Sequence, residues 1–369
     1  MEATISERES ALTLQALPGI GALALGKLQR QFGSFAKALQ APLHTLAPAY
    51  RKGLSAFRAN PNDFKTRALA TLDTCIQDDI KIVLISCPDY PPLLREIDTA
   101  PALLFVKGDS QTLNLPQIAI VGSRQHSTNG QQNAQAFARH LANSGFAITS
   151  GMALGIDGAA HQGAMEGGKT IAVLGTGVDV VYPRRHTTLY NQIIASGGAI
   201  VSEFPPGTPP RAGNFPQRNR IISGLSLGVL VVEAALRSGS LITARLAMEQ
   251  GREVFALPGS IHNPGAKGCH QLIRQGAALV ETSDDIINEL GGLLAYQAEI
   301  VKQPATPESP NALDEASNKV LAALGFDPAD LDTLMARTQL PAATLSAQLV
   351  QLELEGWVEQ RVGIYNRLR

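Results

Sequence analysis

Three arginines and one phenylalanine lie within ten residues near the middle of the chain. They are Arg211, Phe215, Arg218 and Arg220, and no acidic residue lies among them. Guanidinium groups without a local counter-charge favour a polyanion, because they form charge-assisted hydrogen bonds with phosphate. An aromatic ring beside them adds a surface on which an unpaired base can stack. This spacing favours single-stranded nucleic acid, although a solvated loop entering an ordinary helix would have the same composition.

A second candidate anion site follows the short apolar run Gln117–Val121, which is typical of a buried strand. The run ends at Gly122, Ser123 and Arg124, and a helical pattern covers Gln131–Ser144. Unpaired backbone N–H groups at the start of a helix bind anions, and Arg124 adds a bidentate donor for phosphate. The alternative is a tight turn that connects strand to helix and binds nothing.

The elements that position these residues follow from an alternation of short apolar runs and helical stretches. This alternation predicts an α/β fold with a doubly wound, mostly parallel sheet, whose ligand site lies at the carboxyl ends of the strands. The small-residue and basic segments described above fall at those ends. The predicted strands are Ile82–Ile85, Leu103–Val106, Ile118–Val121, Ala147–Thr149, Ile171–Leu174, Ala199–Val201, Val229–Val232, Val254–Leu257 and Ala278–Val280, and predicted helices include Gln131–Ser144, Thr187–Ser196 and Leu241–Gln250.

Residues 1–75 are predicted to form a small all-α domain. Its turn Leu17–Gly21 between two helical patterns resembles a helix-hairpin-helix motif, as found in SAM-like domains, and Lys27 and Arg30 follow one turn apart. In such a motif the turn amides meet a DNA phosphate. A compact helical hairpin without a ligand is the competing interpretation.

The predicted α/β domain covers residues 76–295, and a Pro-rich linker covers residues 296–312. Residues 313–369 resemble a winged helix, with three helical patterns over 314–324, 328–338 and 341–355 and a short hairpin around Val362 and Gly363. The third helical pattern contains no lysine or arginine. We therefore expect this domain to dock protein or to regulate rather than to enter a major groove.

Composition limits the function classes. The 369 residues are 44% hydrophobic, which predicts a sizeable core, and the formal net charge of −1 means that any basic surface is local. Three scattered cysteines fit a reducing cytoplasm and give no disulfide scaffold or zinc cluster. The acidic, polar N-terminus is unlike a secretion signal, and no apolar run reaches the ~20 residues of a membrane span. We expect a cytoplasmic protein without a bound metal or cofactor.

An enzyme is the alternative hypothesis. Asp157, His161, Asp179 and Glu233 lie near predicted strand ends, and a carboxylate there could act on a sugar ring, as in a nucleotide N-glycohydrolase or phosphoribohydrolase. Against this, the chain lacks the Pro-Gly-Gly-x-Gly-Thr run of phosphoribohydrolases, a complete dinucleotide fingerprint and a P-loop. A structural role is favoured for each group: Asp157 as a helix cap and Glu233 as a partner of the turn Ser238–Ser240.

The order of the motifs resembles the bacterial DNA-processing protein A (DprA/Smf) family over residues 80–290. The motifs are Val-Gly-Ser-Arg at 121–124, Ser-Gly-Met-Ala-Leu-Gly-Ile-Asp-Gly-Ala-Ala-His at 150–161, Val-Leu-Gly-Thr-Gly-Val-Asp-Val-Val-Tyr-Pro at 173–183, Ser-Glu-Phe-Pro-Pro-Gly at 202–207, Phe-Pro-Gln-Arg-Asn-Arg-Ile-Ile-Ser-Gly-Leu-Ser at 215–226, Glu-Ala-Ala-Leu-Arg-Ser-Gly-Ser-Leu-Ile-Thr-Ala at 233–244, Pro-Gly-Ser-Ile at 258–261 and Gly-Cys-His-Gln-Leu-Ile at 268–273. The N-terminal helical and C-terminal winged-helix-like segments match longer family members less specifically.

This resemblance implies a Rossmann-like domain that binds DNA and is not an enzyme. It implies sequence-independent binding of single-stranded DNA, protection of DNA entering the cell during natural transformation, and loading of the RecA recombinase by a homodimer. By motif, Ser123 and Arg124 hold phosphate, Arg218, Asn219 and Arg220 line the basic pocket, and Phe215 stacks on a base; Gly122 and Arg211 complete the predicted DNA site. Because residues two apart on a helix do not share a face, we expect one of Arg218 and Arg220 to meet phosphate and the other to pack or pair within the fold. Leu272 and Ile273 are candidates for the dimer contact, or ordinary core residues of an amphipathic helix.

Overall fold

The computed structural model describes residues 6–291, 315–325, 328–354, 357–361 and 364–367. Tertiary contacts divide the chain into two units, Met1–Ala298 and Glu299–Arg369. The predicted linker, residues 296–312, lies outside the described residues. None of the helices in the described part of the chain has the length and apolar character needed to cross a bilayer.

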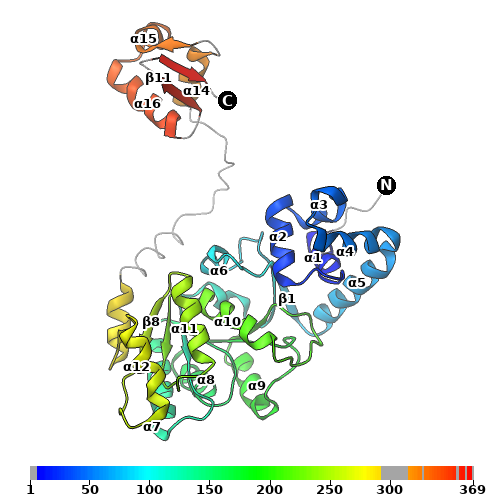
Figure 1. The fold of residues 1–369 in the computed structure, drawn as a ribbon, viewed down its shortest axis with the longest axis vertical. Helices are drawn as coiled ribbons and strands as arrows, with labels where there is room; N and C mark the ends of the chain where they lie inside the picture. The colour runs from blue at the N-terminus through cyan, green and yellow to red at the C-terminus, as the bar shows by residue number, and fades with distance from the viewer. Residues whose placement is uncertain (1–5, 292–314, 326–327, 355–356, 362–363, 368–369) are drawn as a thin grey trace. The chain divides into compact units, whose positions relative to one another are not determined.

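The first unit begins with a helical layer (blue in Figure 1), as the sequence predicts. The helices are α1 (Glu7–Gln15), α2 (Ala22–Phe32), α3 (Phe35–Gln40), the 3-10 turn η1 (Leu43–Thr45), α4 (Pro48–Ala59) and α5 (Pro61–Gln77). Gly53 on α4 packs against the turn between α1 and α2, where an added Cβ would lie 2.6 Å from the Pro18 carbonyl oxygen. Glycine at this position therefore lets α4 reach the predicted hairpin turn.

A nine-stranded, mostly parallel sheet follows, which confirms the predicted fold class. Its spatial order is β1-β2-β6-β5-β4-β3-β7-β8-β9. Strand β2 pairs antiparallel with β1 and β6, and the other pairs are parallel. The strands are β1 (Ile80–Leu84), β2 (Leu103–Gly108), β3 (Gln117–Val121), β4 (Ala147–Ser150), β5 (Thr170–Val173), β6 (Ala199–Ser202), β7 (Gly228–Val231), β8 (Glu253–Ala256) and β9 (Ala278–Leu279).

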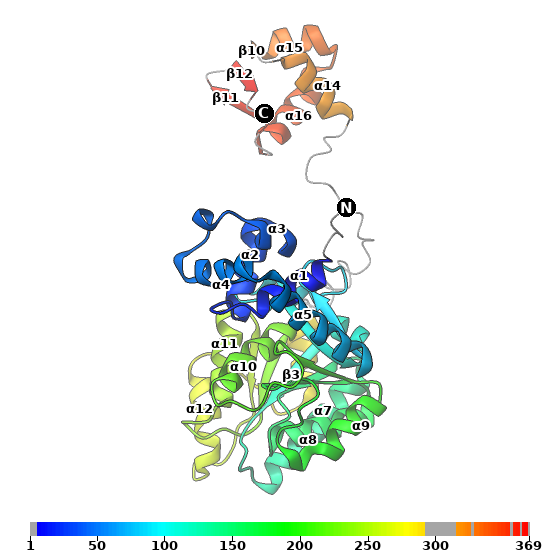
Figure 2. The same ribbon diagram turned by 90° about the vertical axis from the view of Figure 1, so that its right-hand side faces the viewer.

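Both faces of the sheet are covered by helices, because alternate residues of each strand point to opposite faces. In β3, Ile118 and Ile120 belong to one apolar cluster and Ala119 and Val121 to another. Helices α7, α8 and α9 lie on one side and α10, α11 and α12 on the other (Figure 2). The helices of this unit are α6 (Pro92–Glu96), α7 (Thr128–Asn143), α8 (Ile156–Gly167), α9 (Thr187–Ala195), α10 (Asn214–Leu225), α11 (Ser240–Glu249) and α12 (Lys267–Arg274).

The strand order reverses direction at β3. The chain proceeds from β3 through β4 and β5 to β6, and then returns to place β7 on the other side of β3. Ligands of doubly wound sheets bind where the order reverses, outside the carboxyl ends of the strands. Arg124 follows β3 and Glu233 follows β7, so the topology brings both residues to this point.

The second unit is a small winged-helix domain. It contains α14 (Glu315–Leu324), α15 (Leu331–Thr338) and α16 (Ala342–Leu354), with a three-stranded antiparallel sheet in the order β10-β12-β11. The strands are β10 (Ala329–Asp330), β11 (Val358–Arg361) and β12 (Ile364–Arg367). Val320, Leu334, Leu349 and Val358 are among its core residues. The three predicted helices and the hairpin are confirmed, and β10 is an addition.

Candidate nucleic-acid interface

The loop after β3 is fixed by contacts on both sides. The Ser123 N–H donates to the Glu233 carbonyl oxygen (2.7 Å), and the Ile156 N–H donates to the Ser123 carbonyl oxygen (3.2 Å). Gly155 has a φ of +88° and packs so closely that a Cβ there would lie 2.3 Å from the Ser123 oxygen. Arg124 is exposed at the end of this rigid turn. Its guanidinium is therefore presented to solvent from a fixed backbone position.

The start of α7 already holds an anion, which corrects the predicted phosphate site on this helix. The Glu233 carboxylate accepts hydrogen bonds from the Ser127 N–H and the Ser127 hydroxyl, each 3.0 Å long. Ser127 also caps the helix by accepting from the Gly130 N–H. This cap moves the start of the helix to Thr128, three residues before the predicted Gln131. A phosphate at this turn therefore depends on Arg124 and the loop, not on free amides of α7.

Glu233 was predicted to support the turn Ser238–Ser240, and that prediction is wrong. The hydroxyls of Ser238 and Ser240 hydrogen-bond to each other (2.7 Å). The Glu233 carboxylate instead accepts from Ser127 and, at 3.5 Å, from the Asn263 side chain. Glu233 thus ties the loop after β3 to the segment that precedes α12.

Arg218 lies inside the protein, although the sequence assigned it to the DNA pocket. Its side chain donates to the carbonyl oxygens of Gly151, which follows β4, and of Val173, the last residue of β5. An added Cβ on Gly151 would lie 2.6 Å from the guanidinium, so glycine makes room for it. Burial lowers the pKa of Arg218 to about 10, Asp157 raises it and Arg124 lowers it further. Arg218 therefore joins the ends of β4 and β5 inside the fold.

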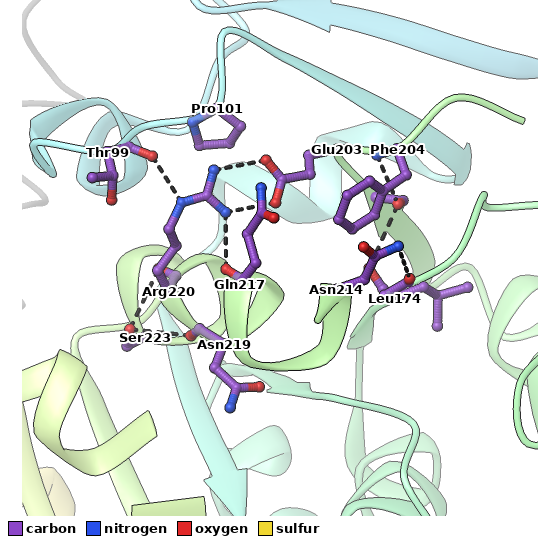
Figure 3. Close-up of polar contacts among 12 residues, drawn as sticks. Thr99, Pro101, Leu174, Glu203, Phe204, Asn214, Gln217, Asn219, Arg220 and Ser223 are labelled. Carbon is purple, nitrogen blue, oxygen red and sulfur yellow. Dashed lines mark hydrogen bonds and ion pairs between the residues drawn. The ribbon is translucent and has the colours of Figure 1, made fainter. Parts of the chain in front are cut away.

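Arg220 is also buried, and it has an acidic partner that local sequence does not show. Its guanidinium forms two hydrogen bonds with the Glu203 carboxylate (2.6 and 2.7 Å) and one with the Thr99 carbonyl oxygen (3.0 Å; Figure 3). The Gln15 side chain on α1 reaches the Glu203 carbonyl oxygen (3.3 Å). Arg220 thus forms an ion pair inside the fold, as the helix spacing predicts for one of Arg218 and Arg220.

An aromatic pair lies at the same edge of the sheet. Phe215 on α10 is half-buried, and its ring centroid lies 5.4 Å from that of Tyr182, which is 43% exposed. A Cβ on Gly175 would lie 2.9 Å from the Phe215 ring, and the Asn214 side chain donates to the Gly175 carbonyl oxygen (3.0 Å). Gly175, two residues after β5, therefore leaves room for the Phe215 ring. The Tyr182 ring is the more accessible of the two.

Exposed cations accompany the aromatic pair. Arg211 is exposed four residues before Phe215, and Arg184 and Arg185 are exposed just after Tyr182. Sequence reasoning missed Tyr182, Arg184 and Arg185, although an aromatic residue followed closely by two arginines after a strand was a usable signal. Asn219 is half-buried, and its amide points away from the Arg220 guanidinium in Figure 3.

The residues of the enzyme hypothesis have structural partners. Asp157 is buried and accepts from the N–H groups of Gly151 and Ala153 in the preceding loop, so it braces that loop rather than capping α8. Burial raises its pKa above the ordinary value, against the lowering effect of Arg218. Asp179 accepts from the Gly207 N–H with both carboxylate oxygens. His161 is buried beside Thr170.

Leu272, one of the two candidate dimer residues, lines a groove between α11 and α12. Leu272 is buried (4% exposed), and Ile273 packs half-buried against the same core. The groove measures about 400 Å³, and it is lined by Leu236, Leu241, Arg245, Met248, Gln271, Leu272 and Gln275. Leu236 and Met248 are 57% and 41% exposed. The accessible apolar surface therefore comes from these two residues, and Leu272 is a core residue at the edge of the groove.

Comparison with known families matches this architecture to two models. Residues 81–291 match the DNA recombination-mediator protein A family, and residues 304–363 match the DprA winged helix domain. The first match covers more than half of the chain. The chain belongs to this DprA/Smf family. The resemblance drawn from the ordered motifs is confirmed, and the family assigns the chain to the DNA recombination mediators.

Relatives support the same assignment. Protein Smf from Escherichia coli is 49% identical over 287 residues, which cover 76% of this chain and 75% of the relative. The X-ray structure of DprA from Streptococcus pneumoniae aligns with a TM-score of 0.64 at 39% identity, covering 78% of this chain and 99% of that one. A structure of DprA from Helicobacter pylori, described by its single-stranded DNA binding mode, aligns with a TM-score of 0.52 at 31% identity, covering 57% and 95%.

Proposed function

We propose that this DprA-family chain binds single-stranded DNA without sequence preference at the carboxyl edge of its parallel sheet. The observation that carries this proposal is the shared edge of exposed Arg124 and the Phe215–Tyr182 aromatic pair. Arginines bind phosphates, and aromatic rings stack on unpaired bases of any identity. The single-stranded DNA binding described for the Helicobacter pylori relative supports the same ligand class.

Each part of the edge has its own role in this proposal. Gly122 and Ser123 hold the turn, Arg124 binds a phosphate, and Arg211, Arg184 and Arg185 contact the strand on the aromatic side. Tyr182 and Phe215 stack on bases. Arg218 and Arg220 support this surface from inside the fold. Arg218 connects α10 to the ends of β4 and β5, and Arg220 connects α10 to the segment before β2. Asn219 borders the site.

In the cell, we propose that the protein protects incoming single-stranded DNA in the cytoplasm and helps to load RecA on it during natural transformation. The membership in the recombination-mediator family supports this role. The engagement of Asp157, Asp179 and Glu233 inside the fold favours binding over nucleotide hydrolysis.

The proposal predicts a preference for single strands. Oligo(dT) of 30 nucleotides should bind more tightly than a blunt 30-bp duplex at matched salt, because only unpaired bases can stack on Tyr182 and Phe215. Affinity should fall as salt rises, since phosphate contacts release counterions. Fluorescence anisotropy at two salt concentrations measures both effects. Equal or tighter binding to the blunt duplex would reject the proposed ligand, and release of free base from a nucleotide panel would favour the hydrolase.

We also propose a homodimer formed through the groove between α11 and α12. Leu236→Glu should give a folded monomer, because it places a charge on an apolar side chain that is 57% exposed in the single chain. Leu272→Glu is the matched contrast, since it buries a charge in the core and should unfold the protein. Light scattering with circular dichroism separates these outcomes. A folded Leu236→Glu dimer would place the interface elsewhere.

A further inference from the structure

The positive charge of this chain is concentrated in its N-terminal helices. The whole chain holds 31 Lys and Arg against 32 Asp and Glu. Residues 7–77, which form helices α1 to α5, hold nine of these cations and four acids, so the other residues hold 22 cations and 28 acids; eight of the nine cations and one of the four acids lie in residues 10–72. A local excess of this size creates a positive potential even in a chain with almost no net charge. The eight cations are Lys27, Arg30, Lys37, Arg51, Lys52, Arg58, Lys65 and Arg67.

The fold gathers several of them around the segment Ala41–Leu46. From α4, Arg51 donates to the Leu46 carbonyl oxygen (3.0 Å) and Arg58 donates to the Ala41 carbonyl oxygen (2.5 Å). From α2, Gln31 donates to the Thr45 carbonyl oxygen (2.9 Å).

Lys27 lies one turn before Gln31 on α2, and residues four apart share a helix face. Lys27, Arg51, Lys52 and Arg58 are all exposed. We call these four residues the N-terminal basic surface. Arg51 and Arg58 thus lie at the segment Ala41–Leu46, and Lys27 and Lys52 are exposed on the two helices, α2 and α4, that contact this segment.

The single acid of this stretch does not neutralise the surface. Asp63 pairs with Arg67 one turn away on α5 (2.9 Å), and Arg67 also covers the Phe64 ring. Arg51 and Arg58 are bonded to neutral carbonyl oxygens, which fix their positions, and neither forms an ion pair within the part of the chain that the structure describes. Cations held in this way favour an anionic partner with regularly spaced charges.

This surface differs from the sheet edge because it has no aromatic ring as accessible as Tyr182: Tyr50 and Phe57 on α4 are half-buried. On the described residues of the N-terminal helices, the exposed large apolar side chains are Leu23, Leu69 and Ile76, and none is aromatic. Single strands are held by charge together with aromatic stacking, whereas a duplex hides its bases and is held through its phosphates. The chemistry of the N-terminal basic surface therefore fits the backbone of a duplex.

We propose that the N-terminal basic surface binds the phosphate backbone of duplex DNA and is separate from the single-strand site at the sheet edge. The protein would then bind most tightly to DNA in which a duplex adjoins a single strand. The partner is duplex DNA of any sequence, since phosphate contacts position a protein without identifying a base.

The test uses the full chain and two probes: oligo(dT)30, and a 20-bp duplex that carries a 15-nucleotide dT tail. The variant is Lys27→Gln/Lys52→Gln, which leaves the structural hydrogen bonds of Arg51 and Arg58 intact. Its matched control is Lys107→Gln/Arg139→Gln, which removes the same charge elsewhere in the first unit. Lys107 pairs with Ile200 on β6 away from its carboxyl end, and Arg139 forms an exposed ion pair with Glu166.

Lys27→Gln/Lys52→Gln should lose about tenfold in affinity for the tailed duplex at 0.1 M salt, and its salt slope should fall by about 2. The affinity of this variant for oligo(dT)30 should equal that of the parent. The control variant should bind both probes with the affinity of the parent. Equal losses on both probes, or no loss on the tailed duplex, would overturn the proposal. A competition assay separates DNA from an acidic protein as the partner. If polyglutamate displaced the tailed duplex as efficiently as a plain duplex does, the N-terminal basic surface would be a site for acidic proteins instead.

The result is independent of the single-strand proposal. Arg124→Ala should weaken both probes, because both contain a single strand. If Arg124→Ala bound oligo(dT)30 like the parent while Lys27→Gln/Lys52→Gln still lost the tailed duplex, the sheet-edge assignment would fail and the N-terminal basic surface would stand.

Discussion

Arg220→Met is expected to lower the free energy of unfolding by about 3–5 kcal/mol, which is the usual cost of leaving one partner of a buried ion pair unpaired. The Arg220 and Glu203 side chains are only 7% and 1% exposed, so the remaining carboxylate would be left buried without its partner. The Thr99 carbonyl oxygen would lose its donor as well. Chemical denaturation of parent and variant measures the difference.

The double variant Arg220→Met/Glu203→Gln is the control for this prediction. It removes both charges, so it should recover a large part of the stability that the single variant loses. Arg220 was assigned to the DNA pocket by sequence, and the experiment also decides that question. If the Arg220→Met protein were as stable as the parent but bound single strands more weakly, Arg220 would be a DNA-binding residue and the predicted structural role would be wrong.

The second large effect is a dependence of stability on pH that comes from His161. Thr170 donates its hydroxyl proton to the Ile148 carbonyl oxygen, so His161 Nδ1 must donate to the Thr170 oxygen (2.7 Å). The other ring nitrogen, Nε2, is buried without a hydrogen-bond partner among the described residues. Burial, together with His186 and Arg218, lowers the pKa of His161 from 6.5 to about 3.

Because the unfolded chain binds this proton below pH 6.5 and the folded chain does not, the free energy of unfolding falls as pH drops from 6.5 towards 3. The full loss is about 5 kcal/mol, at roughly 1.4 kcal/mol for each pKa unit. His161→Gln should flatten this part of the stability curve, and His44→Gln on the surface should not. Asp157 titrates in all three proteins, so the difference isolates His161. Parallel curves for parent and His161→Gln would contradict the assignment.

The fold could be predicted in detail because its strands are buried apolar runs of similar length. All nine predicted strands of the sheet occur, with shifts of one or two residues at their ends. The sequence predicted a helix cap at Asp157 but gave no bounds for helix α8 (Ile156–Gly167), since this segment is rich in glycine and alanine and lacks a clear apolar stripe. Strand β10 has only two residues, too short for a pattern.

The candidate site was predicted less completely, because local sequence does not show which charges meet in space. Arg124 and Arg211 are exposed as expected. The acidic residues that bind Arg220 and Ser127 lie far from them in the sequence. Glu203 precedes Arg220 by 17 residues, and Glu233 follows Ser127 by 106. Helix spacing predicted that one of Arg218 and Arg220 lies inside the fold, but a basic segment without neighbouring acids gave no reason to expect that both are buried.

The central claim is that Arg124 and the aromatic pair bind a single strand together, and the affinity for oligo(dT)30 as a function of salt tests it most directly. Arg124→Ala should cost about 1.5–3 kcal/mol, or one to two decades in affinity, with a salt slope shallower by about 0.7. Phe215→Ala, or Tyr182→Ala if the half-buried Phe215 is needed for folding, should cost about 1–3 kcal/mol with an unchanged slope. Arg139→Ala on α7 is the control. Folded Arg124→Ala and Tyr182→Ala proteins that both bind like the parent would contradict the account and move the single-strand site away from the sheet edge.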